Sequence, residues 1–262
     1  MPARQAPGWC VRSVRNRYAL SDRHEVVIES PRHDWNPATA TEAELTDVLV
    51  AWQQRHRALR SGAAAVAVFR NKGAAAGGSL THPHSQVVGL PVLPAGTARE
   101  IAIAEEHYRI HRRGIAEDLL AAELSHGERV LLDDGVVTAF VPFAPSADFE
   151  VWLAPATHRA DFAAVPHAEL THVARGLRAV LAALRTALHD PAYNLVVHTA
   201  PTAYVSAPFL SWHIRVVPRL VTPAGLELAT GIPVLTVAPE TCADRLRAAL
   251  PAAPDAAPAV VP

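Results

Sequence analysis

Apolar and polar residues alternate in eight short stretches of the chain, and this period of two predicts β-strands. The stretches in the first half are 11–20, 24–29, 63–69 and 82–88, and those in the second are 135–143, 149–153, 193–198 and 212–217. Helical spacing covers 98–122, with a break near Gly114, and 166–188. Strands mixed with helices in this way predict an α+β protein.

A further helix is predicted from Thr41 to about Leu59. Thr41 and Glu44 have the spacing of a capping box, in which each side chain bonds the other residue's backbone. The helical period of 3.6 is carried by the apolar positions Leu45, Val48, Leu49 and Trp52.

The two halves of the chain repeat the order strand, strand, helix, strand, strand. The segment 25–33 (EVVIESPRH) matches 150–158 (EVWLAPATH), and 82–86 (HPHSQ) matches 211–215 (SWHIR). This repetition predicts an internal duplication. We expect two tandem units, at 1–95 and 96–250, with antiparallel sheets flanked by helices. A Pro/Ala-rich tail at 251–262 is expected to be disordered.

Composition excludes several classes of protein. The net charge is −1, and the absence of a basic block argues against nucleic-acid binding. No apolar run reaches membrane-spanning length, and the N-terminus lacks the apolar centre of a secretory signal. The two cysteines, Cys10 and Cys242, lie far apart, which argues against a disulfide framework or a cysteine zinc knuckle. We therefore expect a soluble cytoplasmic protein.

The segment 69–90 (FRNKGAAAGGSLTHPHSQVVGL) concentrates the chemistry. On a strand, His82, His84 and Gln86 share one face. The small-residue loop 73–78 would let a ligand approach the backbone, whose N–H groups could hold an anion.

His84 is the predicted nucleophile, because a neutral imidazole has an unperturbed pKa of about 6.5. Its attack on an α-phosphorus would give a covalent nucleotidyl-histidine. Gln86 would donate to a non-bridging oxygen, while Asn71, Ser79 and the loop amides would hold the departing phosphate. The alternative roles for His84 are a metal ligand or a buried structural histidine.

The string Asn-Lys-Gly-x-x-x-Gly-x-Ser-Leu-x-His-Pro-His-Ser-Gln, residues 71–86, resembles the active-site segment of galactose-1-phosphate uridylyltransferases, in the histidine-triad superfamily. The resemblance implies two fused histidine-triad units, with His84 as nucleophile and Gln86 on the phosphoryl group. It also implies a set of nucleotide- and phosphate-binding residues: Asn16, Asn71, Gly77, Gly78 and Ser79.

The same resemblance implies two metal sites. His33 and His82 match two ligands of the family's zinc site. The pattern begins after the place of the family's cysteine pair, so the N-terminus is expected to be shortened. The zinc site is then expected to be a half-site of His33 and His82. The alternative is that these two histidines serve only in hydrogen bonding. For a second divalent metal, Glu100, His198 and His213 match family ligands, with Ser211 in place of a third histidine, and an internal polar cluster is the alternative.

Near the C-terminus, 225–232 (GLELATGI) resembles the family's sugar-proximal segment, which includes Gly231 and reaches the partner's site in a dimer. A homodimer is therefore expected. Glu227 stands where enzymes dedicated to galactose phosphate often have lysine. A plain strand and turn is the alternative for this segment.

Three functions are compatible with the sequence. The first is a nucleotidyltransferase that moves UMP between a UDP-sugar and a hexose 1-phosphate. The second is a phosphorylase or hydrolase, in which phosphate or water resolves a nucleotidyl-histidine formed from a nucleotide sugar or a dinucleoside polyphosphate. The third is a degenerate, non-catalytic nucleotide-binding protein.

Overall fold

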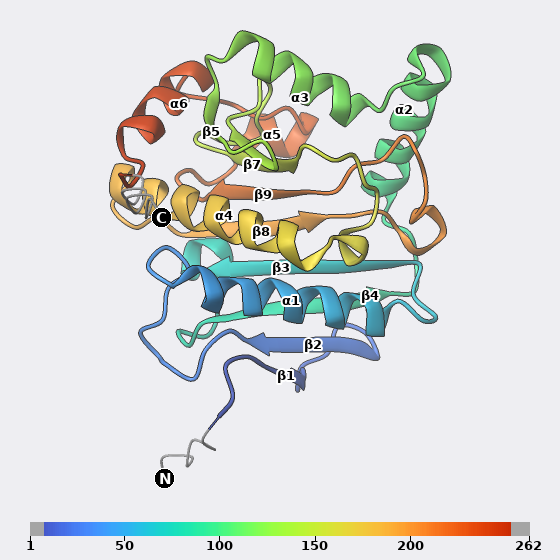
Figure 1. The fold of residues 1–262 in the computed structure, drawn as a ribbon, viewed down its shortest axis with the longest axis vertical. Helices are drawn as coiled ribbons and strands as arrows, with labels where there is room; N and C mark the ends of the chain where they lie inside the picture. The colour runs from blue at the N-terminus through green and yellow to red at the C-terminus, as the bar shows by residue number, and fades with distance from the viewer. Residues whose placement is uncertain (1–7, 253–262) are drawn as a thin grey trace, which may run out of the picture.

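A computed structural model of the chain describes residues 8–252, so most of the expected tail, from residue 253, lies outside the described residues. Within this range, nine strands form one antiparallel sheet in the order β1-β2-β4-β3-β8-β9-β7-β6-β5 (Figure 1). The strands are β1 (Arg12–Arg15), β2 (Arg23–Ile28), β3 (Ala65–Lys72), β4 (His84–Leu90), β5 (Val130–Asp133), β6 (Val137–Phe140), β7 (Val151–Pro155), β8 (Tyr193–His198) and β9 (His213–Pro218). The helices are α1 (Glu42–Leu59), α2 (Ala95–His111), α3 (Ile115–His126), α4 (His167–Ala187), α5 (Gly225–Thr230) and α6 (Pro239–Ala248), with short 3-10 turns at Ala74–Ala76, Phe162–Ala164 and Thr202–Tyr204.

The sheet is continuous because β3 pairs with β8, with Val68 opposite Val197 and Asn71 opposite Asn194. The order β1-β2-β4-β3 on one side of this seam is repeated as β6-β7-β9-β8 on the other. The repeated strand order agrees with the matching segments in the sequence. The separate sheets expected from the sequence are thus halves of a single sheet.

Helices α1 and α4 lie side by side on one face of the sheet and build the core (Figure 1). Their inward positions, such as Val48, Trp52, Leu170 and Leu177, are almost completely buried. Helix α1 begins with the predicted capping box, since Glu44 N donates to Thr41 Oγ1 at 3.2 Å and Thr41 N donates to Glu44 Oε2 at 2.9 Å. The helical break near Gly114 is also confirmed, because it separates α2 from α3.

The stretch 11–20, expected to be a strand that enters a turn, has its strand end at Arg15, and the chain turns where Tyr18 N donates to Asn16 Oδ1 at 2.9 Å. Several other elements differ from the predictions. The segment 225–230 is a short helix rather than a strand and turn. Strand β5 and helix α6 were not predicted; α6 begins at a proline and buries Cys242, Ala243 and Leu246. Within residues 8–252, no helix combines the length and apolarity that a membrane crossing needs.

Candidate active site

Strand β4 divides its side chains between the two faces of the sheet. Ser85 faces the core, where its Oγ accepts a hydrogen bond from Trp52 Nε1 at 2.6 Å. By the alternation of a strand, His84 and Gln86 stand on the opposite face. The predicted placement of His84 and Gln86 on one face is therefore confirmed. His82 precedes the strand and lies in the turn that leads into it.

The His84 ring is held by the backbone of its own segment. Its Nδ1 lies 2.8 Å from the carbonyl oxygen of His82, which can only accept a hydrogen bond. The proton of a neutral His84 therefore sits on Nδ1, and Nε2 carries the free lone pair. The side chain is nine-tenths buried but retains 8% exposure. Orientation and tautomer together prepare Nε2 to act as a nucleophile.

The turn that carries His84 is fastened to β2. Glu29 N donates to the carbonyl oxygen of Pro83 at 3.1 Å. The Glu29 side chain is buried against Arg70, whose Nε lies 3.0 Å from Oε2, and Arg70 Nη1 donates to Tyr193 Oη at 2.8 Å. This buried cluster connects the end of β2 with β3 and β8 beside His84.

Gln86 is oriented by His24, a residue that lies outside every motif found in the sequence. Leu20 N donates to His24 Nδ1 at 3.0 Å, so a neutral His24 carries its proton on Nε2. His24 Nε2 lies 2.8 Å from Gln86 Oε1 and donates to it. The carbonyl end of the Gln86 amide is thereby occupied, which leaves its NH2 group as a donor. Only the pairing of β2 with β4 could have revealed this contact.

Asn16, which the resemblance assigns to nucleotide binding, lies in the same cluster. Its backbone N donates to the His24 carbonyl oxygen at 2.9 Å, and its Nδ2 lies 3.1 Å from His24 Nε2. Asn16 Oδ1 already accepts from Tyr18 N. The amide nitrogen of Asn16 therefore lies on the side of His24 and Gln86.

The small-residue loop after β3 is a tight turn with two glycines at positive φ, 83° at Gly73 and 77° at Gly77. A Cβ on Gly78 would lie 3.0 Å from the backbone oxygens of Asn71 and Gly73, so a larger residue there would have to push the loop backbone apart. Gly78 N donates to Gly73 O, and Gly77 N to Ala74 O, both at 2.9 Å. These two amides are used within the loop and are not available to hold an anion, which differs from the expectation for loop amides.

Asn71 at the end of β3 and Ser79 just after the loop are the flanking side chains that a phosphate could contact. Asn71 Oδ1 accepts from Asn194 Nδ2 at 2.9 Å, which leaves the Asn71 Nδ2 group as a donor. Asn194 Nδ2 also donates to Ala76 O at 2.9 Å and so fixes the loop to β8. Ser79 is exposed.

Comparison with known proteins identifies relatives of this chain. Residues 21–94 match the family model described as galactose-1-phosphate uridyl transferase, N-terminal domain. An ADP-glucose phosphorylase from Arabidopsis thaliana is 27% identical over 92% of this chain and 75% of its own length. A galactose-1-phosphate uridylyltransferase from Haemophilus influenzae is 33% identical over 51% of this chain and 38% of its own.

Solved structures agree with this match. A uridylyltransferase structure superposes with a TM-score of 0.84 at 28% identity, covering 93% of this chain and 87% of the other. The Arabidopsis thaliana ADP-glucose phosphorylase with bound ADP-glucose gives 0.84 at 26% identity, covering 93% and 83%. In sequence and in fold the chain is galactose-1-phosphate uridylyltransferase-like.

The zinc half-site predicted for this uridylyltransferase-like protein brings its two histidines together. His33 Nδ1 lies 2.9 Å from His82 Nδ1, and the rings meet edge to face. His82 Nε2 donates to the Ser30 carbonyl oxygen at 2.8 Å, the outer contact typical of a metal-ligating histidine. Among the described residues, no third His, Cys, Asp or Glu joins them in a group able to hold a metal ion. The pair fits two of the four ligands that zinc requires, and zinc binding stays a prediction.

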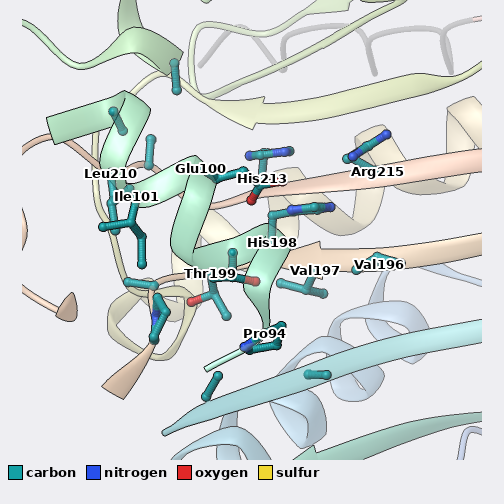
Figure 2. Close-up of a pocket in the computed structure, with 18 of the residues that line it drawn as sticks. Pro94, Glu100, Ile101, Val196, Val197, His198, Thr199, Leu210, His213 and Arg215 are labelled. Carbon is teal, nitrogen blue, oxygen red and sulfur yellow. The ribbon is translucent and has the colours of Figure 1, made fainter. Parts of the chain in front are cut away.

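The residues predicted for a second metal surround a separate cavity of about 400 Å3 between the sheet and helices α2 and α3 (Figure 2). His198 and His213 stack with ring centroids 4.7 Å apart, and Glu100 lies on α2 at the cavity wall. Burial lowers the pKa of His198 to about 4 and that of His213 well below its usual value, with Arg215 adding to both effects. The rings are therefore neutral near pH 7, as ligands must be.

The second site nevertheless fits a metal ion poorly as it stands. No group of three His, Cys, Asp or Glu side chains gathers there within residues 8–252. The Arg215 guanidinium lines the same cavity and pairs with Glu150 at 2.7 Å, which places a positive charge beside the histidines. His213 Nε2 is buried without a hydrogen-bond partner. A divalent ion at Glu100, His198 and His213 therefore remains a prediction.

Gly231 ends α5 at a φ of 72°, and its N donates to Glu227 O at 2.8 Å. The apolar side chains of this helix point outward, with Leu226 55% and Leu228 79% exposed. In the described part of the chain, its hydrogen bonds stay within the segment and do not reach β2 or β4. Gly231 is thus not brought to His84 within one copy of the chain.

Proposed function

We propose that this chain is a nucleotidyltransferase that moves UMP from a UDP-sugar to a hexose 1-phosphate through a covalent nucleotidyl-His84. The single observation that carries the proposal is the hydrogen bond from His84 Nδ1 to the His82 carbonyl oxygen at 2.8 Å. It leaves the Nε2 lone pair on the same sheet face as the donor amide of Gln86. The shared family of the relatives supports this type of reaction.

In the first step, His84 Nε2 attacks the α-phosphorus of the nucleotide sugar. A phosphorus–nitrogen bond forms, and the bond from the α-phosphorus to the bridging oxygen breaks, so that sugar 1-phosphate leaves with the electron pair. Positive charge develops on the imidazole, and the His82 carbonyl stabilises it through Nδ1–H. The Gln86 NH2 group donates to a non-bridging oxygen of the transferred phosphoryl group.

In the second step, a phosphate oxygen of the incoming hexose 1-phosphate attacks the same phosphorus. The phosphorus–nitrogen bond breaks, and the electron pair returns to Nε2, so the neutral ring is restored. No net proton transfer to the protein is required, because Nδ1 keeps its proton throughout. This fits a histidine whose Nδ1 faces a carbonyl rather than a carboxylate.

A second candidate is a phosphorylase, in which inorganic phosphate replaces the hexose 1-phosphate as the attacking group. The observation that favours it is the match to the Arabidopsis thaliana ADP-glucose phosphorylase over 92% of this chain. The first chemical step is the same in both candidates, so His84 and Gln86 keep their roles. The two differ in the nucleotide and in the acceptor.

We also propose that the active form is a homodimer and that His33 and His82 bind zinc. The exposed apolar residues of α5 support the dimer, because they would be covered by a second copy. The convergent Nδ1 atoms of the two histidines support zinc.

The test uses UDP-glucose and ADP-glucose, each labelled with 32P at the α-phosphorus. Label should appear on the protein as an acid-labile, base-stable adduct, map to the peptide with His84, and be absent in His84→Ala. The exposed His126→Ala serves as control and should label normally. A chase with galactose 1-phosphate releases labelled UDP-galactose if the first candidate holds, and a chase with phosphate releases a labelled nucleoside diphosphate if the second holds. Tight nucleotide binding without label from either sugar would overturn both and indicate a non-catalytic binding protein.

A further inference from the structure

Three rings stand in a row on the sheet face opposite α1 and α4. Trp152 of β7 stacks on His213 of β9 with centroids 4.4 Å apart and planes 18° apart. His213 stacks in turn on His198 of β8 at 4.7 Å and 5°. Because the three strands are neighbours in the sheet, the row has the spacing of the strands, about 4.8 Å.

The row stops at His198, although the sheet continues. The next strand is β3, where Val68 is paired with Val197, so the antiparallel register places Ala67 beside His198. Ala67 has only a methyl group; its neighbours on the same face of β3 are Ala65, which lines the cavity with it, and Phe69, which does not. A ring at the next position of the row would therefore occupy the space above Ala67.

That space belongs to the cavity of about 400 Å3, a volume within the range of small-molecule sites. Figure 2 shows His198 and His213 at its wall, with Pro94 and Ile101 on the side of α2. The lining includes Ala65, Ala67 and His198 but neither His84 nor Gln86. The cavity is thus separate from the proposed nucleotidyl-transfer site.

His198 has features of a binding residue rather than of a packing residue. Within the described chain its ring nitrogens have no hydrogen-bond partner, and one face of the ring is covered by His213. Its opposite face is turned toward the strand that carries Ala67.

We propose that this cavity binds a planar aromatic molecule, which extends the Trp152–His213–His198 row by stacking on the free face of His198 above Ala67. The proposal is independent of the reaction at His84. It uses the face of the His198 ring, whereas metal binding would use the ring nitrogens. Stacked aromatic pairs contribute beyond the area they bury, so a planar ring should be preferred over a saturated one of equal size.

The test compares 2-naphthol with decahydro-2-naphthol, which have the same carbon skeleton and hydroxyl group. Binding is measured by saturation-transfer NMR on the full chain, with EDTA present to remove metal ions. We expect 2-naphthol to bind about three- to tenfold more tightly, the factor that one aromatic stack provides. Equal affinity for the two compounds, or no saturable binding of 2-naphthol, would overturn the proposal.

Two sets of variants locate the site. Ala67→Phe places a ring in the slot and should reduce 2-naphthol binding at least about tenfold. His198→Phe keeps a ring and should retain the aromatic preference, whereas His198→Leu should reduce the affinity ratio to about one. If Ala67→Phe does not fold, the comparison of the two His198 variants still decides. A folded Ala67→Phe that binds normally, or a His198→Leu that retains the preference, contradicts the assignment.

Discussion

The hydrogen bond from His24 to Gln86 gives a prediction about the proposed reaction. It distinguishes the effect of the orientation of the Gln86 amide from the effect of having that amide at all. Besides its contact with Asn16 Nδ2, His24 makes two hydrogen bonds through different ring atoms: Nδ1 accepts from Leu20 N, and Nε2 donates to Gln86 Oε1. An asparagine at position 24 can reproduce the first contact, because its Oδ1 replaces Nδ1. A glutamine can reproduce the second, because its Nε2 replaces that of histidine. Each variant therefore loses one hydrogen bond at a site that is 2% exposed.

The expected magnitudes follow from what each lost bond does. A typical hydrogen bond contributes about 0.5–1.5 kcal/mol, so either variant should be destabilised by roughly this amount or somewhat more. Only His24→Asn leaves Gln86 Oε1 without its donor and lets the amide turn its oxygen toward the phosphoryl group. The labelling rate of His84 at saturating nucleotide sugar should then fall about 2- to 13-fold, the rate equivalent of that same energy. Complete removal of the Gln86 donor sets the upper limit, about 10²–10³-fold.

The assay is single-turnover labelling of His84 by rapid quench, together with thermal unfolding of each variant. We expect the two melting temperatures to fall by similar amounts, while the labelling rate falls in His24→Asn and stays within about twofold of the parent in His24→Gln. In a Gln86→Met background, His24→Asn should have no further effect, because the amide to be oriented is gone. Equal labelling rates in the two His24 variants, with the parent protein labelling normally, would refute the orienting role without affecting the role of His84.

Three further predictions concern the surroundings of the site. Gly78→Ala should strongly reduce labelling and lower the melting temperature, because its Cβ would lie 3.0 Å from the Asn71 backbone oxygen; normal labelling by this variant would show that the loop can shift. Arg70→Met should cost about 3–5 kcal/mol in urea unfolding, because it leaves the Glu29 carboxylate buried without its partner; a loss below about 1 kcal/mol would contradict this. Burial lowers the pKa of His56 to about 4, so the unfolded chain binds the proton more tightly than the folded chain does. The free energy of unfolding should therefore fall by up to about 3 kcal/mol as the pH drops from 6.5 to 4. His56→Gln should flatten that part of the stability profile, and an unchanged slope would exclude His56 as its source.

The local features of the fold could be predicted because they depend on residues close in sequence. The capping box of α1 needs only Thr41 and Glu44, three positions apart, and both bonds are present. The common face of His84 and Gln86 follows from the two-residue period of a strand. Helix α5 shows the limit of this reasoning, since its six residues, none of them buried, carry no apolar period that would separate a helical turn from a strand.

Features that depend on strand register could not be predicted, and they include the parts of the site with the most specific chemistry. His24 is 62 residues from Gln86 in sequence, and they meet because β2 pairs with β4. The pairing of β3 with β8 likewise turns two repeated units into one sheet and places His198 beside Ala67. The same duplication therefore gives matching histidines different surroundings in its two halves. In the first half, His84 on β4 is paired with Ile28 on β2 and keeps 8% exposure. In the second half, the matching His213 lies between Trp152 and His198, so that both faces of its ring are covered by other rings.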